Sequence, residues 1–124
     1  MQTTVFIVDW EMCQIGVRPL DLGQMIAEIY NLFLFKGIEA GKWLVEGFAE
    51  GYGYVDDDFA YRVAIHTGVH LVGITHQVQG WGDEAQVQKV VEIGAELIVR
   101  AWHKDRSWFE ASDLACLFRK TESA

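Results

Sequence analysis

The sequence has few of the residues from which disulfide scaffolds, cysteine zinc sites and membrane spans are built. Its two cysteines, Cys13 and Cys116, are far apart and neither belongs to a Cys-x-x-Cys pair. This usage argues against a disulfide framework and favours a reducing compartment. A run of about 18 apolar residues, the signature of a membrane-spanning helix, is absent. The first residues, Met1–Thr4, lack the basic charge of a secretory signal. We therefore expect a cytoplasmic protein.

Basic residues are also scarce. Ten lysines and arginines stand against 18 acidic residues, so the formal net charge is −8. An acidic surface repels nucleic-acid phosphates and anionic lipid, and we expect neither a nucleic acid nor a membrane as partner. A cationic small molecule would be favoured, although ordinary solubilising charge explains the same balance. Charged residues make up only 23% and hydrophobic residues 51%. This imbalance is compatible with a homo-oligomer or with a missing lobe of the same fold.

The 124 residues fit one domain, and its first predicted element is a strand. Thr4–Val8 is β-branched and apolar on both faces, as buried strands are. Because a lone strand is not stable, this one requires a partner strand or hairpin. The polar stretch that follows contains Gly16 and Pro19 and is typical of a loop.

Four or five helices are predicted after this loop. Asp21 with Gln24, and Asp83 with Gln86, have the spacing of capping boxes at helix starts. The expected helices run from Asp21 to Gly37, from about 39 to 51, from 59 to 78 and from 83 to 102, with a short fifth segment from Ser112 or Asp113. The expected inward-facing residues are Leu22, Met25, Ile26, Ile29, Phe33, Leu44, Val45, Phe48, Tyr52, Val87, Val90, Val91, Gly94, Leu97, Ile98, Ala101 and Trp102. The fold class is mainly α with a short N-terminal β strand or hairpin.

Two acidic residues directly follow the predicted strand. Asp9 and Glu11 are two positions apart, and on an extended segment such residues point to the same side. Mg²⁺ takes oxygen ligands, typically one or two carboxylates together with phosphate oxygens and water. The pair is therefore a candidate metal half-site, although two solvated turn acids explain the spacing as well.

The residues around this pair resemble a signature of the aminoglycoside phosphotransferase and choline kinase superfamily. The similarity lies in Val5–Glu11, in Gly16 and in the Arg-Pro-Leu-Asp-Leu-Gly string at Arg18–Gly23. Methylthioribose kinases look similar over the same stretch. Fungal-type aminoglycoside phosphotransferase domain proteins also resemble the chain at Gly47-Phe48 and Gly51–Gly53, and their likeness extends over roughly residues 4–109.

The resemblance implies a protein-kinase-like C-terminal lobe in an ATP-dependent small-molecule phosphotransferase, with ATP and Mg²⁺ as cofactors. It makes Asp9 the metal-binding aspartate, the counterpart of the Asp-Phe-Gly aspartate of protein kinases. Glu11 would be a second or water-mediated metal ligand. Asp21 looks like the aspartate that opens the next helix and supports the catalytic segment, a role that a simple N-cap would also satisfy.

The chain departs from the family pattern in the groups that do the chemistry. A His-Gly-Asp loop with the catalytic base, an Asn for metal and an N-terminal lobe with a phosphate-binding Lys are not visible in it. The nearest string, His66-Thr67-Gly68, is predicted to lie within a helix. We therefore assign no catalytic residue and no ATP-binding residue, and expect residues 1–124 to be a C-terminal lobe that is inactive as an isolated chain.

Three alternatives remain open from the sequence. The chain could be a non-catalytic helical remnant that serves as an interaction module. His66 and His70 are four positions apart on one helical face and could bind zinc, although packed histidines are more common than ligands there. Asp56, Asp57 and Asp58 could recognise an aminated substrate, or they could simply cap the next helix.

Overall fold

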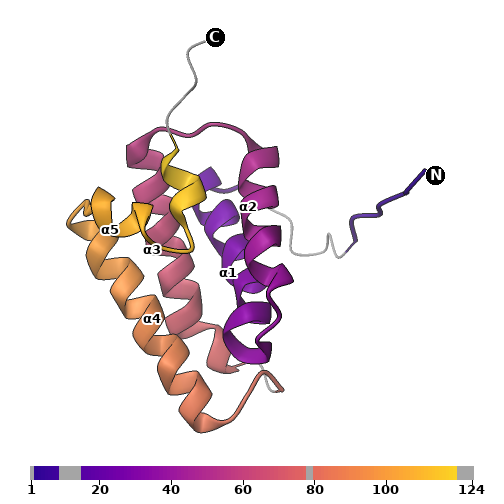
Figure 1. Ribbon diagram of the computed structural model, residues 1–124, viewed down its shortest axis with the longest axis vertical. Helices are drawn as coiled ribbons and strands as arrows, with labels where there is room; N and C mark the ends of the chain where they lie inside the picture. The colour runs from indigo at the N-terminus through magenta and orange to yellow at the C-terminus, as the bar shows by residue number, and fades with distance from the viewer. Residues whose placement is uncertain (1, 9–14, 78–79, 120–124) are drawn as a thin grey trace.

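The computed structural model describes residues 2–8, 15–77 and 80–119, and these form a helical bundle (Figure 1). Helix α3 packs against α1 and against α4, while α2 packs against α1. The helices are α1 (Arg18–Lys36), α2 (Ala40–Tyr52), α3 (Asp57–Gly73), α4 (Glu84–Trp102) and α5 (Arg106–Glu110), with 3₁₀ turns η1 (Thr75–Gln77) and η2 (Ala115–Phe118). None of the described helices is both long and apolar enough to cross a membrane.

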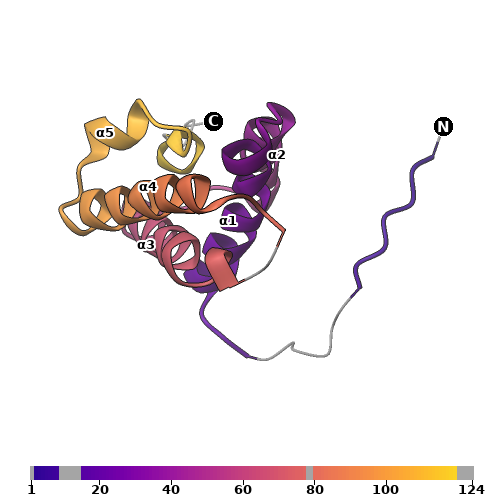
Figure 2. The same cartoon turned by 90° about the horizontal axis from the view of Figure 1, so that it is seen from below.

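The predicted N-terminal strand is not formed. Residues 2–8 run away from the helices in both views (Figures 1 and 2), and Val5 and Phe6 are 79% and 82% exposed. The physical reason is pairing. A strand needs a neighbour for its backbone hydrogen bonds, and the described part of the chain contains no other strand. An apolar β-prone sequence is thus insufficient by itself.

The first helix starts one turn earlier than predicted. Helix α1 begins at Arg18, its N-cap is Val17, and no side chain caps it, so the capping box expected at Asp21 and Gln24 is wrong. Pro19 explains the early start, because proline is well tolerated in the first turn, where no amide partner is needed. Asp21 instead lies inside that turn, where its charge suits the helix dipole. The predicted end at Gly37 is confirmed, with φ of 63°.

The later helix starts follow their capping signals. The capping box of Asp83 and Gln86 is confirmed, and the Asp56 carboxylate accepts a bond of 2.8 Å from the Phe59 amide at the start of α3. Helix α3 ends at Gly73 and continues as η1, so the helix expected as far as residue 78 is shorter. The fifth helix was misplaced. It begins at Arg106, after the N-cap Asp105, and only η2 lies in the region where a helix was expected.

Helix α3 is the centre of the core, because it packs against both α1 and α4, and it contacts α4 very closely at two glycines. A methyl group placed on Gly68 would lie 2.5 Å from the Gly94 carbonyl oxygen, and one on Gly94 would lie 2.8 Å from that of Gly68. The buried core comprises Leu22, Ile26, Ala27, Tyr30, Phe35, Val45, Ala49, Ala60, Tyr61, Val63, Ala64, Leu71, Val90, Leu97, Ala101, Phe109, Leu114, Leu117 and Phe118.

The inward face predicted for α2 is mostly wrong. Val45 is buried, whereas Leu44, Phe48 and Tyr52 are exposed. Helix α2 turns its small residues inward instead, with Gly41 and Ala49 buried beside Val45. A methyl group on Gly41 would lie 2.9 Å from the Phe33 amide nitrogen of α1. Close helix approach therefore decided the orientation, and larger apolar side chains were left outside.

Candidate functional site

The two predicted metal ligands cannot be compared with the structure. Asp9 and Glu11 lie outside the described residues. Asp21, the third predicted site residue, is exposed on the first turn of α1, where its backbone amide donates to the Val17 carbonyl oxygen at 3.3 Å. The support that Asp21 would give to a metal site stays a prediction.

The structure adds a cavity that was not predicted. A pocket of about 440 Å³ lies between α1, α4 and the segment from α5 to η2. This volume falls within the range of small-molecule sites, roughly 300–1,000 Å³. The pocket combines apolar side chains with acidic groups. Its lining residues are Tyr30, Lys89, Glu92, Ile93, Glu96, Leu97, Trp108, Ala111, Ser112, Asp113 and Leu114.

A hydrogen bond between distant parts of the sequence anchors one side of this pocket. The buried Tyr30 hydroxyl donates to the Asp113 carboxylate at 2.6 Å. Burial first, and then the bond to Asp113, raises the pKa of Tyr30 well above its ordinary value, so the phenol stays a neutral donor. Lys42 lies 3.7 Å from the other Asp113 oxygen. The Asp113 carboxylate is therefore held in place at the edge of the cavity.

Arg100 holds Trp108 in the wall of the pocket. The Arg100 guanidinium lies 5.6 Å from the centre of the Trp108 ring and bonds to both Glu96 and Asp105 at 2.8 Å. The hydrogen bond from Arg100 holds the pKa of Asp105 below its usual range, assisted by the bond from the Trp108 amide. Arg100 thus neutralises Glu96 and orients the helix that carries Trp108.

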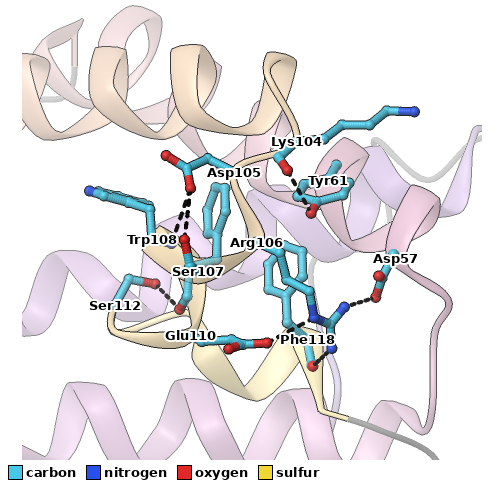
Figure 3. Close-up of polar contacts among 11 residues, drawn as sticks. Asp57, Tyr61, Lys104, Asp105, Arg106, Ser107, Trp108, Glu110, Ser112 and Phe118 are labelled. Atoms are coloured by element: carbon cyan, nitrogen blue, oxygen red, sulfur yellow. Dashed lines mark hydrogen bonds and ion pairs between the residues drawn. The ribbon is translucent and has the colours of Figure 1, made fainter.

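Arg106 ties the pocket wall to the rest of the bundle. Its guanidinium donates to Asp57 at the start of α3, to Glu110 at 2.8 Å and to the Phe118 carbonyl oxygen in η2 (Figure 3). Nearby, the Tyr61 hydroxyl of α3 donates to the Lys104 carbonyl oxygen at 3.1 Å. One side chain therefore links α3, α5 and η2.

We expect Arg106→Gln to loosen η2 without unfolding the bundle. The change removes the fork of donors but leaves Phe109 and Phe118 stacked in the core, with ring centres 4.7 Å apart. Amide hydrogen exchange should become faster at Leu117, whose amide bonds to the Leu114 carbonyl oxygen. The matched control is Arg62→Gln, which removes an exposed pair with Asp58 on α3. Equal exchange in both variants would contradict the role given to Arg106.

The histidine pair has a structural explanation. His70 is buried, and its Nε2 lies 2.6 Å from a Glu28 carboxylate oxygen on α1. His66 lies at the close crossing of α1 and α3, where a methyl group on Gly23 would meet the His66 Cβ at 2.7 Å. In the part of the chain that the structure describes, no three potential ligands gather around a possible metal position. These positions give the zinc hypothesis no support.

The three acidic residues at the start of α3 also have structural partners. Asp56 caps the helix, Asp57 pairs with Arg106, and Asp58 lies 3.2 Å from Arg62. None of the three lines the 440 Å³ pocket. The acidic residues of that pocket come from α4 and from the segment between α5 and η2, and the sequence contained a weak signal for two of them. Glu92 and Glu96 are four positions apart on α4, a spacing that places both on one helical face.

Comparison with known proteins shows a relationship to phosphotransferases. The chain is 29% identical over 100 residues to phosphotransferase FrzJ of a Cladobotryum species, across 81% of this chain and 26% of that protein. It is 25% identical to two proteins named 4-hydroxytryptamine kinase. In Psilocybe cubensis the match covers 121 residues, 96% of this chain and 32% of the relative. In Psilocybe cyanescens it covers 107 residues, 85% of this chain and 29% of the relative.

No family model and no solved structure matches the chain. The chain spans only about a quarter to a third of the length of the curated relatives it matches. Within that span the alignments cover most of the helical bundle. By its sequence the chain is related to kinase-like phosphotransferases.

Proposed function

We propose that this chain is the helical C-terminal lobe of an ATP-dependent small-molecule phosphotransferase of the aminoglycoside phosphotransferase and choline kinase type. The observation that carries this proposal is the similarity to a phosphotransferase and to two kinases across 81–96% of the chain. The bundle is consistent with it, because the described residues form one helical body around α3. In the proposed enzyme, segments outside these 124 residues supply the catalytic base and the nucleotide-binding lobe.

In this proposal Asp9 and Glu11 hold Mg²⁺. Two carboxylates form the hard oxygen donor set that this ion prefers, with phosphate oxygens and water completing its shell. The bound ion would neutralise charge on the transferred phosphoryl group. Asp21 would support the segment that carries Asp9 and Glu11. It lies in the first turn of α1, is exposed, and follows Glu11 by ten positions in the sequence. We do not expect the isolated chain to transfer phosphate, because it contains no His-Gly-Asp loop.

The proposed metal site can be tested on the chain itself with Mn²⁺ in place of Mg²⁺. Because Mn²⁺ is paramagnetic, binding at Asp9 should broaden the amide NMR signal of its neighbour in sequence, Val8. Excess Mg²⁺ should reverse this broadening. Asp9→Asn should abolish it, since an amide replaces the charged ligand, and Glu50→Gln should leave it unchanged, as an exposed acid on α2. Identical broadening in wild type and Asp9→Asn would remove Asp9 from the site.

A second candidate function, a non-catalytic interaction module, is favoured by the exposed apolar side of α2. Trp43 is 68% exposed, and Leu44, Phe48 and Tyr52 follow one helical face. A protein partner could cover this face, as could another lobe of the proposed enzyme. The two functions differ in their dependence on Asp9. An interaction module would lose no partner binding in Asp9→Asn, but would lose it in Leu44→Glu.

A further inference from the structure

The outer face of α2, defined here by Trp43, Leu44, Gly47, Phe48 and Gly51, is apolar and exposed to solvent. Trp43 is 68% exposed, Leu44 50% and Phe48 38%. The helix turns smaller side chains toward the core instead. Large apolar side chains that gather on one exposed face mark interaction sites on soluble proteins. This face is therefore a candidate docking surface.

Two glycines, Gly47 and Gly51, leave a strip of this face without side chains. A methyl group placed on either glycine would meet no atom within 4 Å. Leu44 and Phe48 form a ridge along one side of this glycine row, because residues four positions apart lie above one another on a helix. A second helix can insert its own ridge of side chains along such a row and approach the backbone closely. The shape of the face therefore suits a helical partner.

Glutamates flank the glycine row on the side away from Leu44 and Phe48. Glu46 and Glu50 are both exposed. On a helix with 3.6 residues per turn they lie across the row from the apolar ridge. Neither glutamate forms an ion pair with a residue that the structure describes. One edge of the outer face is therefore apolar, and the other is negatively charged.

The described cations that contact α2 or belong to it do not pair with these glutamates. Lys42 lies 3.7 Å from the Asp113 carboxylate and 4.1 Å from the centre of an aromatic ring of α1, so its charge is directed to other partners. Arg119 donates to a backbone carbonyl oxygen of α2 at 3.2 Å. The carboxylates of Glu46 and Glu50 therefore retain acceptor capacity for a basic group from outside the chain.

We propose that the outer face of α2 docks an amphipathic helix of a separate protein, with a leucine stripe and with lysine or arginine along one flank. The stripe packs on Trp43, Leu44 and Phe48 across the glycine row. The basic flank pairs with Glu46 and Glu50. A second copy of the chain fits less well, because it would bring the same two glutamates and the same net charge of −8. This inference rests on the interaction module proposed above and names the chemistry of its partner.

Three fluorescently labelled peptides of about 18 residues, five turns of helix, test this chemistry. They share leucines at helical spacing and differ only in the flanking residues, which are lysine, glutamine or glutamate. Fluorescence anisotropy measures the Kd of each peptide for the 124-residue chain without nucleotide or metal. Amide NMR signals of Gly47 and Gly51 show where the peptide binds. We expect the lysine peptide to bind about fivefold more tightly than the glutamine peptide, through two exposed ion pairs, and the glutamate peptide to bind least.

Two variants test the contacts themselves. Glu46→Gln combined with Glu50→Gln should weaken the lysine peptide about fivefold and leave the glutamine peptide unchanged. The matched control, Glu84→Gln combined with Glu92→Gln, removes the same charge from exposed positions of α4 and should change neither affinity. Gly47→Leu keeps the charge but fills the glycine row. It should weaken both peptides about tenfold, while its far-UV circular dichroism stays that of wild type.

The proposal is overturned if folded Gly47→Leu binds the lysine peptide like wild type, or if no peptide binds. Equal binding of all three peptides would keep the interaction module but overturn the basic partner. A dimer in sedimentation, with Gly47 signals that shift on dilution, would assign the face to a second copy instead. Because metal and nucleotide are absent, these outcomes are independent of the phosphotransferase proposal.

A full-length hybrid tests whether another lobe of the proposed enzyme covers the face. In this hybrid the chain replaces the matching segment of the Psilocybe cubensis 4-hydroxytryptamine kinase, which aligns with 96% of it. The lysine peptide should bind the hybrid as tightly as it binds the chain. Binding to the chain but not to the folded hybrid would assign the outer face of α2 to that lobe and overturn the docking of a separate protein.

Discussion

Replacing Asp9 by Asn in a hybrid enzyme should reduce phosphoryl transfer at least about a hundredfold, the scale on which a single transition-state contact acts. The hybrid carries this chain in place of the matching segment of the Psilocybe cubensis 4-hydroxytryptamine kinase, which aligns with 96% of it. Asparagine keeps the size of aspartate but removes the charge that would hold the metal ion. The measurement is the initial rate of 4-hydroxytryptamine phosphorylation by ATP at saturating Mg²⁺.

Two further variants make this result specific. Glu50→Gln, an exposed acid on α2, should retain the rate of the unmodified hybrid. Glu11→Gln should reduce the initial rate about tenfold, less than Asp9→Asn does, since a water-mediated or supporting ligand contributes less than a direct one. A folded and active hybrid that keeps its full rate in Asp9→Asn would contradict the assignment of Asp9.

The largest expected effect on stability is at the crossing of α3 and α4. Gly68→Ala should lower the free energy of unfolding by about 2–3 kcal/mol, the upper part of the usual range for an overpacked core. The added methyl group would meet the Gly94 carbonyl oxygen at 2.5 Å and the Ile98 side chain at 2.7 Å. A backbone oxygen cannot rotate away as a flexible side chain can, so the two helices must separate. Urea unfolding followed by circular dichroism measures the difference.

The matched control is a glycine in a helix that meets nothing. Gly47 lies within α2, and a methyl group there would have no atom within 4 Å. Gly47→Ala should therefore raise the free energy of unfolding by about 0.5–1 kcal/mol, since alanine restricts the unfolded chain and favours helix. If Gly68→Ala proved as stable as Gly47→Ala, the close approach of α3 and α4 would be disproved.

Local signals in the sequence predicted the helices well where a capping residue or a glycine marked the boundary. Asp56, Asp83 and Gly37 all act at the boundaries that their side chains or backbone freedom indicated. The prediction failed at α1 because Pro19 permitted an earlier start than Asp21 suggested. It failed again at α5, where Asp105 was not recognised as a cap. At α1 two local signals competed within a few residues, whereas at α5 the capping residue was missed.

The candidate site was less accessible to sequence reasoning. Asp9 and Glu11 were inferred from one short motif, and their roles stay predictions. The pocket could not be inferred, because the Tyr30 hydroxyl and the Asp113 carboxylate meet across 83 positions of sequence. The place of Trp108 in the pocket wall depends on contacts with Arg100 and Phe109.

By itself the sequence determined a helical chain of acidic character, with a phosphotransferase-like motif near its start. These properties follow from periodicity, composition and contacts between near neighbours. Only the tertiary structure decided which face of α2 turns inward and whether Thr4–Val8 pairs as a strand. It also decided that acidic residues from α4 and from the segment between α5 and η2 line one cavity. Those outcomes depend on close packing between distant segments, and no local pattern records that packing.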